Sequence, residues 1–204
     1  MLERQALVGL LIKRFPELEA ALNQQASRSD AAPDPGAPVT SLRSYEERQR
    51  QLARLISEEI PKNSREIGVA RSYGDLRENF EYKAAKDMQG LLMRRRAEWE
   101  QQLHEVRPTD FSDYPTDRAG PGTGVRIAWP DGRIETYYLL GLWDQDEKLH
   151  IISSAAQLAE ALRGHAAGDE VDLPDGQGMA RARLLEVMPL PEIIRTWIRG
   201  VDPA

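Results

Sequence analysis

The pattern of hydrophobic and polar positions changes along the chain and predicts helices first and strands later. Before residue 26, large apolar residues recur at helical spacing. They are Leu7, Leu10, Leu11, Phe15, Leu18 and Leu22. Residues 1–25 are therefore predicted to form an N-terminal extension helix with a break at Pro16. A single helix cannot bury such a stripe, so we expect it to pack on the rest of the chain or on a partner.

The pattern over residues 42–106 predicts an antiparallel helical hairpin. The apolar stripe of the first arm comprises Tyr45, Leu52, Leu55, Ile56, Ile60 and Ile67. The second arm repeats every seven residues, as in a coiled coil, at Ala85, Leu92, Trp99 and Val106. With Gly74 near the turn, arms of about 28 residues would be about 40 Å long. Pro61 should kink the first arm or mark its start after a preceding helix.

Beyond residue 124 the period shortens to that of strands. Strands are expected at 125–129, 133–140, 149–152, 170–173 and 179–187, with a helix at 155–163 that Gly164 ends. The fold class is therefore α+β, with an N-terminal antiparallel helical hairpin and a C-terminal antiparallel sheet carrying one helix.

Composition marks the boundaries between these parts. Proline and glycine are concentrated at 26–41 and 107–124, which are predicted to be linkers. The C-terminal domain then spans 125–189, and Pro191 opens a tail helix within 190–204. Whether that tail docks on its own chain or on another stays open.

Charge and residue types exclude several classes of protein. The chain of 204 residues carries a net charge of −6 and has no cysteine, which excludes disulfides, thiol nucleophiles and cysteine-bound zinc. Its three histidines lack metal-binding spacing. Residues 45–106 are neutral overall and 125–204 carry −5, so the chain is a poor candidate for holding nucleic acid by itself. We expect no membrane segment, because no apolar run is long enough.

The richest chemistry lies at the predicted hairpin turn, where Asp75 precedes Glu78 by three residues. One interpretation makes Asp75 the N-cap of the second helix and Glu78 its third residue. The other makes the two carboxylates half of a Mg²⁺ site, because Mg²⁺ commonly takes one or two protein carboxylates and completes its shell elsewhere. No catalytic triad or phosphate-binding loop accompanies them, so a self-sufficient enzyme is not predicted.

The sequence contains two further groups of charged residues. Lys83, Lys86 and Arg94 share an outward basic stripe that Gly90 leaves open, suited to a phosphate or a partner, although a solvated helix face is equally ordinary. Asp144, Asp146 and Glu147 are read as an exposed strand connection.

Residues 70–86, ARSYGDLRENFEYKAAK, closely resemble the hairpin tip of the bacterial GreA/GreB transcript cleavage factors. The matching pattern is AR-x-x-GDL-x-EN-x-EY-x-AA-[KR]. Segments at 151–154, 161–164 and 168–171 resemble that family's second domain, and the resemblance covers about 45–189. Phe80 departs from the family, which usually has a small residue there, and Ala155-Ala156 replace a Ser-Pro step.

This resemblance implies an FKBP-like C-terminal domain on the exterior of RNA polymerase and a hairpin in its secondary channel. Asp75 and Glu78 would then hold a Mg²⁺ ion shared with polymerase, for cleavage of backtracked RNA near its 3′ end. Lys86 would face the nascent RNA, and we extend this contact to Lys83 and Arg94. The chain would be a cytoplasmic elongation factor, nucleoid-associated through polymerase, monomeric when free, and not itself an enzyme.

Two alternatives stay open from the sequence. A Gre-like regulator could occupy the channel and inhibit polymerase without cleavage. A structural hairpin could instead bind another assembly, and it would need Asp75 and Glu78 only as helix caps.

Overall fold

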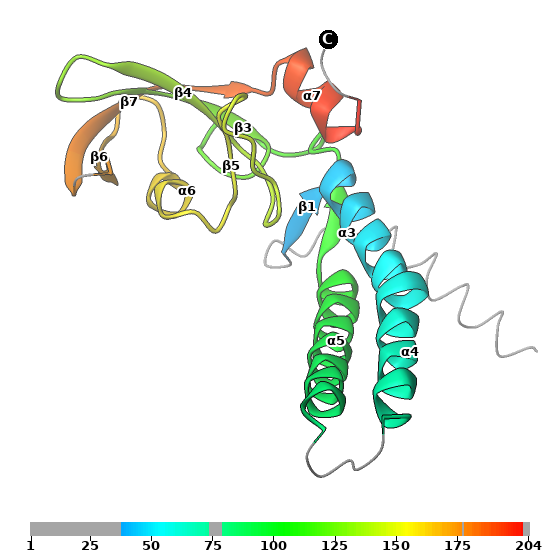
Figure 1. Ribbon diagram of the computed structural model, residues 1–204. Coiled ribbons are helices and arrows are strands. Elements are labelled where there is room, and N and C mark those ends of the chain that lie inside the picture. The colour runs from blue at the N-terminus through cyan, green and yellow to red at the C-terminus, as the bar shows by residue number, and fades with distance from the viewer. Residues whose placement is uncertain (1–37, 74–78, 177, 202–204) are drawn as a thin grey trace, which may run out of the picture. The chain divides into compact units, whose positions relative to one another are not determined.

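The computed structural model describes residues 38–73, 79–176 and 178–201 (Figure 1). The predicted extension helix at 1–25 and most of the predicted linker 26–41 lie outside the described residues. The described residues belong to one compact unit, which begins at Pro38.

Two helical arms form the predicted hairpin. The first arm comprises α3 (Leu42–Arg54), the π-helical turn η1 (Leu55–Glu59) and α4 (Ile60–Arg71). The second arm is the single helix α5 (Phe80–Glu105), which packs beside α4 (Figure 1). The local break predicted at Pro61 is confirmed. Because proline has no N–H to donate, the arm passes through one wide turn, in which the Ile60 N–H bonds to the Leu55 carbonyl, before α4 begins.

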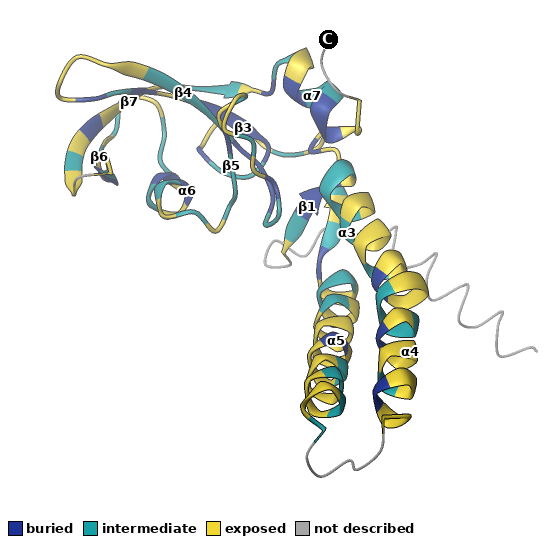
Figure 2. Ribbon diagram, viewed as in Figure 1, coloured by how far each residue is buried: buried dark blue, intermediate teal, exposed yellow. Residues whose placement is uncertain are grey.

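The seam between the arms is narrow, and most positions on both helices are exposed (Figure 2). Leu55, Ala70 and Leu92 are buried. Ile56, predicted in the apolar stripe, is 39% exposed. That prediction was wrong because neighbouring helical residues point about 100° apart, so Leu55 and Ile56 cannot both face the seam.

Polar groups also join the arms. Asn63 is buried, and its Nδ2 donates to the Ala85 carbonyl at 3.0 Å. Nearer the open end of the hairpin, the Tyr45 hydroxyl donates to the Leu103 carbonyl at 3.1 Å. A buried polar group is satisfied in only one alignment, so Asn63 favours the register in which it meets Ala85.

The C-terminal part is a five-stranded sheet in the order β5-β4-β3-β7-β6. Its strands are β3 (Thr123–Ala128), β4 (Ile134–Leu139), β5 (Ile151–Ile152), β6 (Glu170–Pro174) and β7 (Met179–Pro189). Helix α6 (Gln157–Leu162) packs on it, and Leu162 lies in the same core as Ile127 and Leu184. Gly164, with a φ of 81°, follows this helix as predicted.

The sheet is not wholly antiparallel. β5 pairs with β4 in parallel, whereas the β3–β4, β3–β7 and β6–β7 pairs are antiparallel. The expectation of a purely antiparallel sheet was wrong on this edge. Residues 140–150 connect β4 to β5 and carry the chain back, so that β5 runs in the same direction as β4. The two strands are therefore not a simple hairpin.

The segments predicted as linkers contain ordered strands. β1 (Val39–Ser41) pairs in parallel with β2 (Arg107–Thr109), with Thr40 opposite Pro108. Later in the second segment, Phe111 and Ala119 are buried. The prediction of flexible linkers was therefore wrong for these residues. A proline-rich composition does not show which residues will pair with a distant part of the chain.

Asp144 overturns another expectation. The acidic cluster predicted an exposed connection here, yet Asp144 is fully buried. Its carboxylate accepts hydrogen bonds from the backbone N–H of Ser41 and of Gly141 and from the hydroxyls of Thr40 and Ser41. The charge is compatible with burial because four donors surround it.

The tail docks on its own chain. Helix α7 (Glu192–Ile198) follows Pro191 as predicted, and Ile194, Trp197 and Ile198 are buried in a second core with Phe111 and Leu140. The guanidinium of Arg43 lies over the ring of the same Trp197, 5.1 Å from its centre. The tail therefore connects the C-terminal domain with the first turns of α3.

Candidate functional site

The closed end of the hairpin is held by one side chain, Asn79. Its Oδ1 accepts the backbone N–H of Tyr82 at 2.9 Å and so caps the start of α5. Its Nδ2 donates to the carbonyl of Ala70 in the last turn of α4, at 2.6 Å. Both arms are thus tied together where the chain passes from one to the other.

Asp75 and Glu78, the predicted metal-binding and catalytic pair, lie outside the described residues. The structure nevertheless bears on the interpretation of these carboxylates as caps. The N-cap of α5 is Asn79, and the helix begins at Phe80. Asp75 is therefore not the N-cap of this helix, and Glu78 is not its third residue. The capping interpretation of the pair was wrong, because an asparagine four residues later takes that position.

The three predicted contact residues on α5, Lys83, Lys86 and Arg94, are all exposed. Lys86 Nζ donates to Gln89 Oε1 at 2.8 Å. Lys83 Nζ lies 5.8 Å from the centre of the Phe80 ring. Gly90 is open, and nothing lies within 4 Å of where a Cβ would stand. The structure keeps this helix face free of contacts with the described parts of the other arm, as expected for a surface that meets a ligand or solvent.

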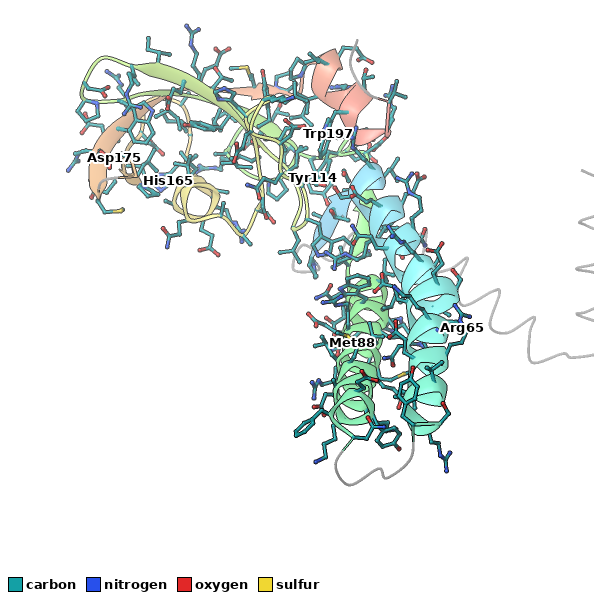
Figure 3. All side chains as sticks on the ribbon, viewed as in Figure 1. Arg65, Met88, Tyr114, His165, Asp175 and Trp197 are labelled. Atoms are coloured by element: carbon teal, nitrogen blue, oxygen red, sulfur yellow. The ribbon has the colours of Figure 1, made fainter. Side chains whose placement is uncertain are left out.

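A groove of about 690 Å³ runs along the other exposed side of the arms near the same end. Its apolar floor includes Val69, Ala84 and Met88, and charged side chains such as Arg65 and Glu66 border it. Arg65 lies on α4 and Met88 on α5 (Figure 3), so both arms contribute to its lining. The groove lacks a convergent set of buried polar groups, so its chemistry is that of an apolar contact surface.

The sequence did not reveal three residues that organise the hairpin and its attachment to the C-terminal part: Asn63, Asn79 as a clamp, and Asp144. Asn63 could have been found, because it stands three residues after Ile60 and four before Ile67, within the helical stripe. Asn79 carried the signal of an N-cap immediately before a periodic helix. Asp144 had no local signal, since its partners at residues 40 and 41 are about 100 positions away.

Within the described ranges, no three His, Cys, Asp or Glu side chains gather closely enough to hold a metal ion. Nor does any helix in those ranges have the length and hydropathy needed to cross a membrane. The described part offers a clamped hairpin end and a helix face that carries Lys83, Lys86 and Arg94.

Comparison with known proteins identifies both halves of this architecture. Residues 39–107 match the N-terminal domain of the transcription elongation factors GreA and GreB, and residues 114–189 match their C-terminal domain. The transcription elongation factor GreA of Trichlorobacter lovleyi is 36% identical over 151 residues, which are 74% of this chain and 95% of that protein. GreA of Pelobacter propionicus is 35% identical over the same shares of both chains.

A solved structure, that of GreA factor homolog 1 from Thermus thermophilus, aligns over 74% of this chain and 98% of its own, with 19% identity and a TM-score of 0.34. That similarity is too low to carry an argument. The two domain matches and the full-length relatives are sufficient without it: this chain belongs to the GreA/GreB family of transcription elongation factors.

Proposed function

We propose that this chain binds RNA polymerase, inserts its helical hairpin into the secondary channel and stimulates cleavage of backtracked RNA near its 3′ end, which rescues arrested complexes. Family membership supports the partner and the process. The observation that carries the proposal is the Asn79 clamp, which ties the ends of α4 and α5 together on either side of the segment that bears Asp75 and Glu78.

The dimensions of the hairpin suit this task. Helix α5 has 26 residues and is about 40 Å long. Within the described ranges two helical arms pack together along this length, so this part of the hairpin is about as narrow as a helix pair can be. The seam contacts, including the Asn63–Ala85 hydrogen bond, keep the two arms in one register. A paired, registered hairpin can carry a short segment deep into a channel without that segment losing its orientation.

Asp75 and Glu78 are proposed as ligands for Mg²⁺. Their oxygen donors are the kind that Mg²⁺ prefers, but two carboxylates leave most of its coordination shell to other groups. We infer that polymerase and water supply the rest. A bound Mg²⁺ stabilises the charge that develops in phosphodiester hydrolysis and lowers the pKa of a bound water. The chain is then a contributor of ligands to the centre of another protein, not a nuclease by itself.

The cap assignment favours this role over a purely structural one. Because Asn79 satisfies the first turn of α5, neither Asp75 nor Glu78 is needed as its N-cap. On the outward face of α5, Lys83, Lys86 and Arg94 offer positive charge that can meet the backbone of the extruded RNA. These contacts are an extension of the proposal, supported by the exposure of all three side chains.

The test uses stalled, backtracked polymerase complexes with labelled RNA, the full chain and Mg²⁺. Wild type should release short fragments from the RNA 3′ end. Asp75→Asn and Glu78→Gln should each slow release by about 100-fold or more, while binding to polymerase is retained. Asp87→Asn, which removes an exposed carboxylate farther along α5, is the matched control and should cleave normally.

The outcomes separate the candidate functions. Binding without any cleavage by wild type would support the channel-binding regulator instead. Full cleavage by the variant with both carboxylates replaced would overturn the metal role. No binding to polymerase would favour the structural hairpin of another assembly.

A further inference from the structure

We propose that Phe80 is a stacking platform for a nucleobase at the extruded 3′ end of the RNA, with Lys83 beside it to meet the RNA backbone. This inference rests on the proposed function, and it names a residue that selects and positions the RNA strand.

The first observation is the exposure of the Phe80 ring. Phe80 is 81% exposed, the largest fraction among the exposed large hydrophobic side chains in the described ranges. It is the first residue of α5, immediately after the Asn79 clamp, and two residues beyond Glu78 in the sequence. The exposed ring contacts Lys83 and leaves the rest of its apolar surface accessible to a ligand.

The second observation is the cation beside the ring. Lys83 is one helical turn after Phe80, and its Nζ lies 5.8 Å from the ring centre. Lys83 also belongs to the outward face that continues to Arg94, away from the Asn63–Ala85 contact in the seam. Glu81 and Asp87 are also exposed on this helix, and Asp87 lies one turn after Lys83, so the face carries both signs of charge and Lys83 is the cation next to the ring.

An aromatic ring next to a cation has the chemistry of a site for single-stranded nucleic acid. Bases stack on aromatic side chains with little dependence on sequence, and basic groups track the phosphates. A purely apolar pocket in polymerase would accept Phe80 but would give Lys83 no partner. The pair therefore favours a nucleotide over a hydrophobic protein contact.

The experiment is a double-mutant cycle, in which the Phe80 side chain and the RNA base are each changed alone and together. Backtracked complexes are assembled on RNAs whose extruded 3′ nucleotides are either normal or abasic. Full-length wild type, Phe80→Leu and Phe80→Trp are compared by Kd for these complexes and by cleavage rate. Leucine keeps an apolar side chain but removes the π face, whereas tryptophan keeps it. Leu91→Ala, at another exposed apolar position of α5, is the control.

Phe80→Leu should weaken binding to complexes with normal RNA by about tenfold and change binding to abasic complexes less than about twofold. Phe80→Trp should bind normal RNA at least as well as wild type. Leu91→Ala should treat both RNAs alike. An equal loss on normal and abasic RNA would show that Phe80 contacts polymerase itself and would overturn the inference, as would no loss on either.

Wild type in the same assays separates this inference from the proposed function. If wild type cleaves and Phe80→Leu does not discriminate between the RNAs, only the stacking role fails. If wild type neither binds nor cleaves, the proposed function fails, and the stacking role fails with it.

Discussion

The Ser41 hydroxyl donates a 2.6 Å hydrogen bond to the carboxylate of Asp144, 103 positions away in the chain. Ser41 is also the N-cap of α3, since its Oγ accepts the backbone N–H of Ser44 at 3.1 Å. One side chain thus starts the first arm of the hairpin and binds it to a buried carboxylate of the C-terminal part.

Replacing Asp144 with Asn should destabilise the fold by about 2–4 kcal/mol. The amide has the same size as the carboxylate, but its NH₂ group replaces one oxygen. N–H groups that donate to a carboxylate oxygen in the wild type, such as those of Ser41 and Gly141, would then face another donor. Urea unfolding measures the change. Glu147→Gln, at an exposed carboxylate in the same connection, should alter the free energy of unfolding by less than about 0.5 kcal/mol. Equal effects of the two changes would contradict this role of Asp144.

Replacing Gly141 with Ala should cost at least about 2 kcal/mol. A Cβ at this position would stand 2.3 Å from both the Thr40 Cα and the Val39 carbonyl oxygen, so main chain would have to move. Gly120→Ala is the control, because nothing lies within 4 Å of its added Cβ. Thermal melts of both variants test this. A Gly141→Ala melt that matches wild type would show that β1 is free to shift away.

The two hydrogen bonds of Asn79 can be separated by substitution. Asn79→Asp keeps an oxygen for the Tyr82 N–H but loses the donor to Ala70, whereas Asn79→Ala loses both. We expect a loss of about 1–2 kcal/mol for alanine and a smaller loss for aspartate, measured by far-UV circular dichroism melts. Gln101→Ala, exposed near the other end of α5, should have little effect.

The same variants also test the clamp in function. If Asn79 orients the closed end of the hairpin, RNA cleavage should fall more than affinity for polymerase with both variants. A parallel fall in the two quantities would indicate that Asn79 supports only the stability of the hairpin.

The Tyr137 hydroxyl should lose its proton at a higher pH than an ordinary tyrosine does. Burial, and then the hydrogen bond that its hydroxyl donates to Glu135 Oε2 at 2.7 Å, raise the pKa of Tyr137 to about 12. Because this folded-state pKa lies above the ordinary tyrosine pKa of 10.0, the stabilisation is fully present below pH 10 and is lost as pH rises through about 12. Ultraviolet titration should show this step. Tyr137→Phe should remove this step. The control Tyr73→Phe, which deletes the hydroxyl of an exposed tyrosine, should leave the step unchanged.

Local patterns in the sequence determined most of the elements. Heptad spacing from Ala85 to Val106 predicted the second arm, and Pro130-Asp131-Gly132 predicted the turn between β3 and β4. Gly164 predicted the end of α6. The motif at 70–86 predicted the family. These signals are readable because helices, tight turns and short motifs depend on residues within a few positions of one another.

Only the tertiary structure decided how these elements meet. The burial of Asp144, the parallel edge at β5, the strand pair in the supposed linkers and the docking of α7 beside Arg43 all join distant residues. A composition rich in proline, or a cluster of three acidic residues, looks the same whether or not such partners exist. Their environment is set when the chain brings donors and apolar surfaces together, for Asp144 across about 100 residues, and no local pattern records that event.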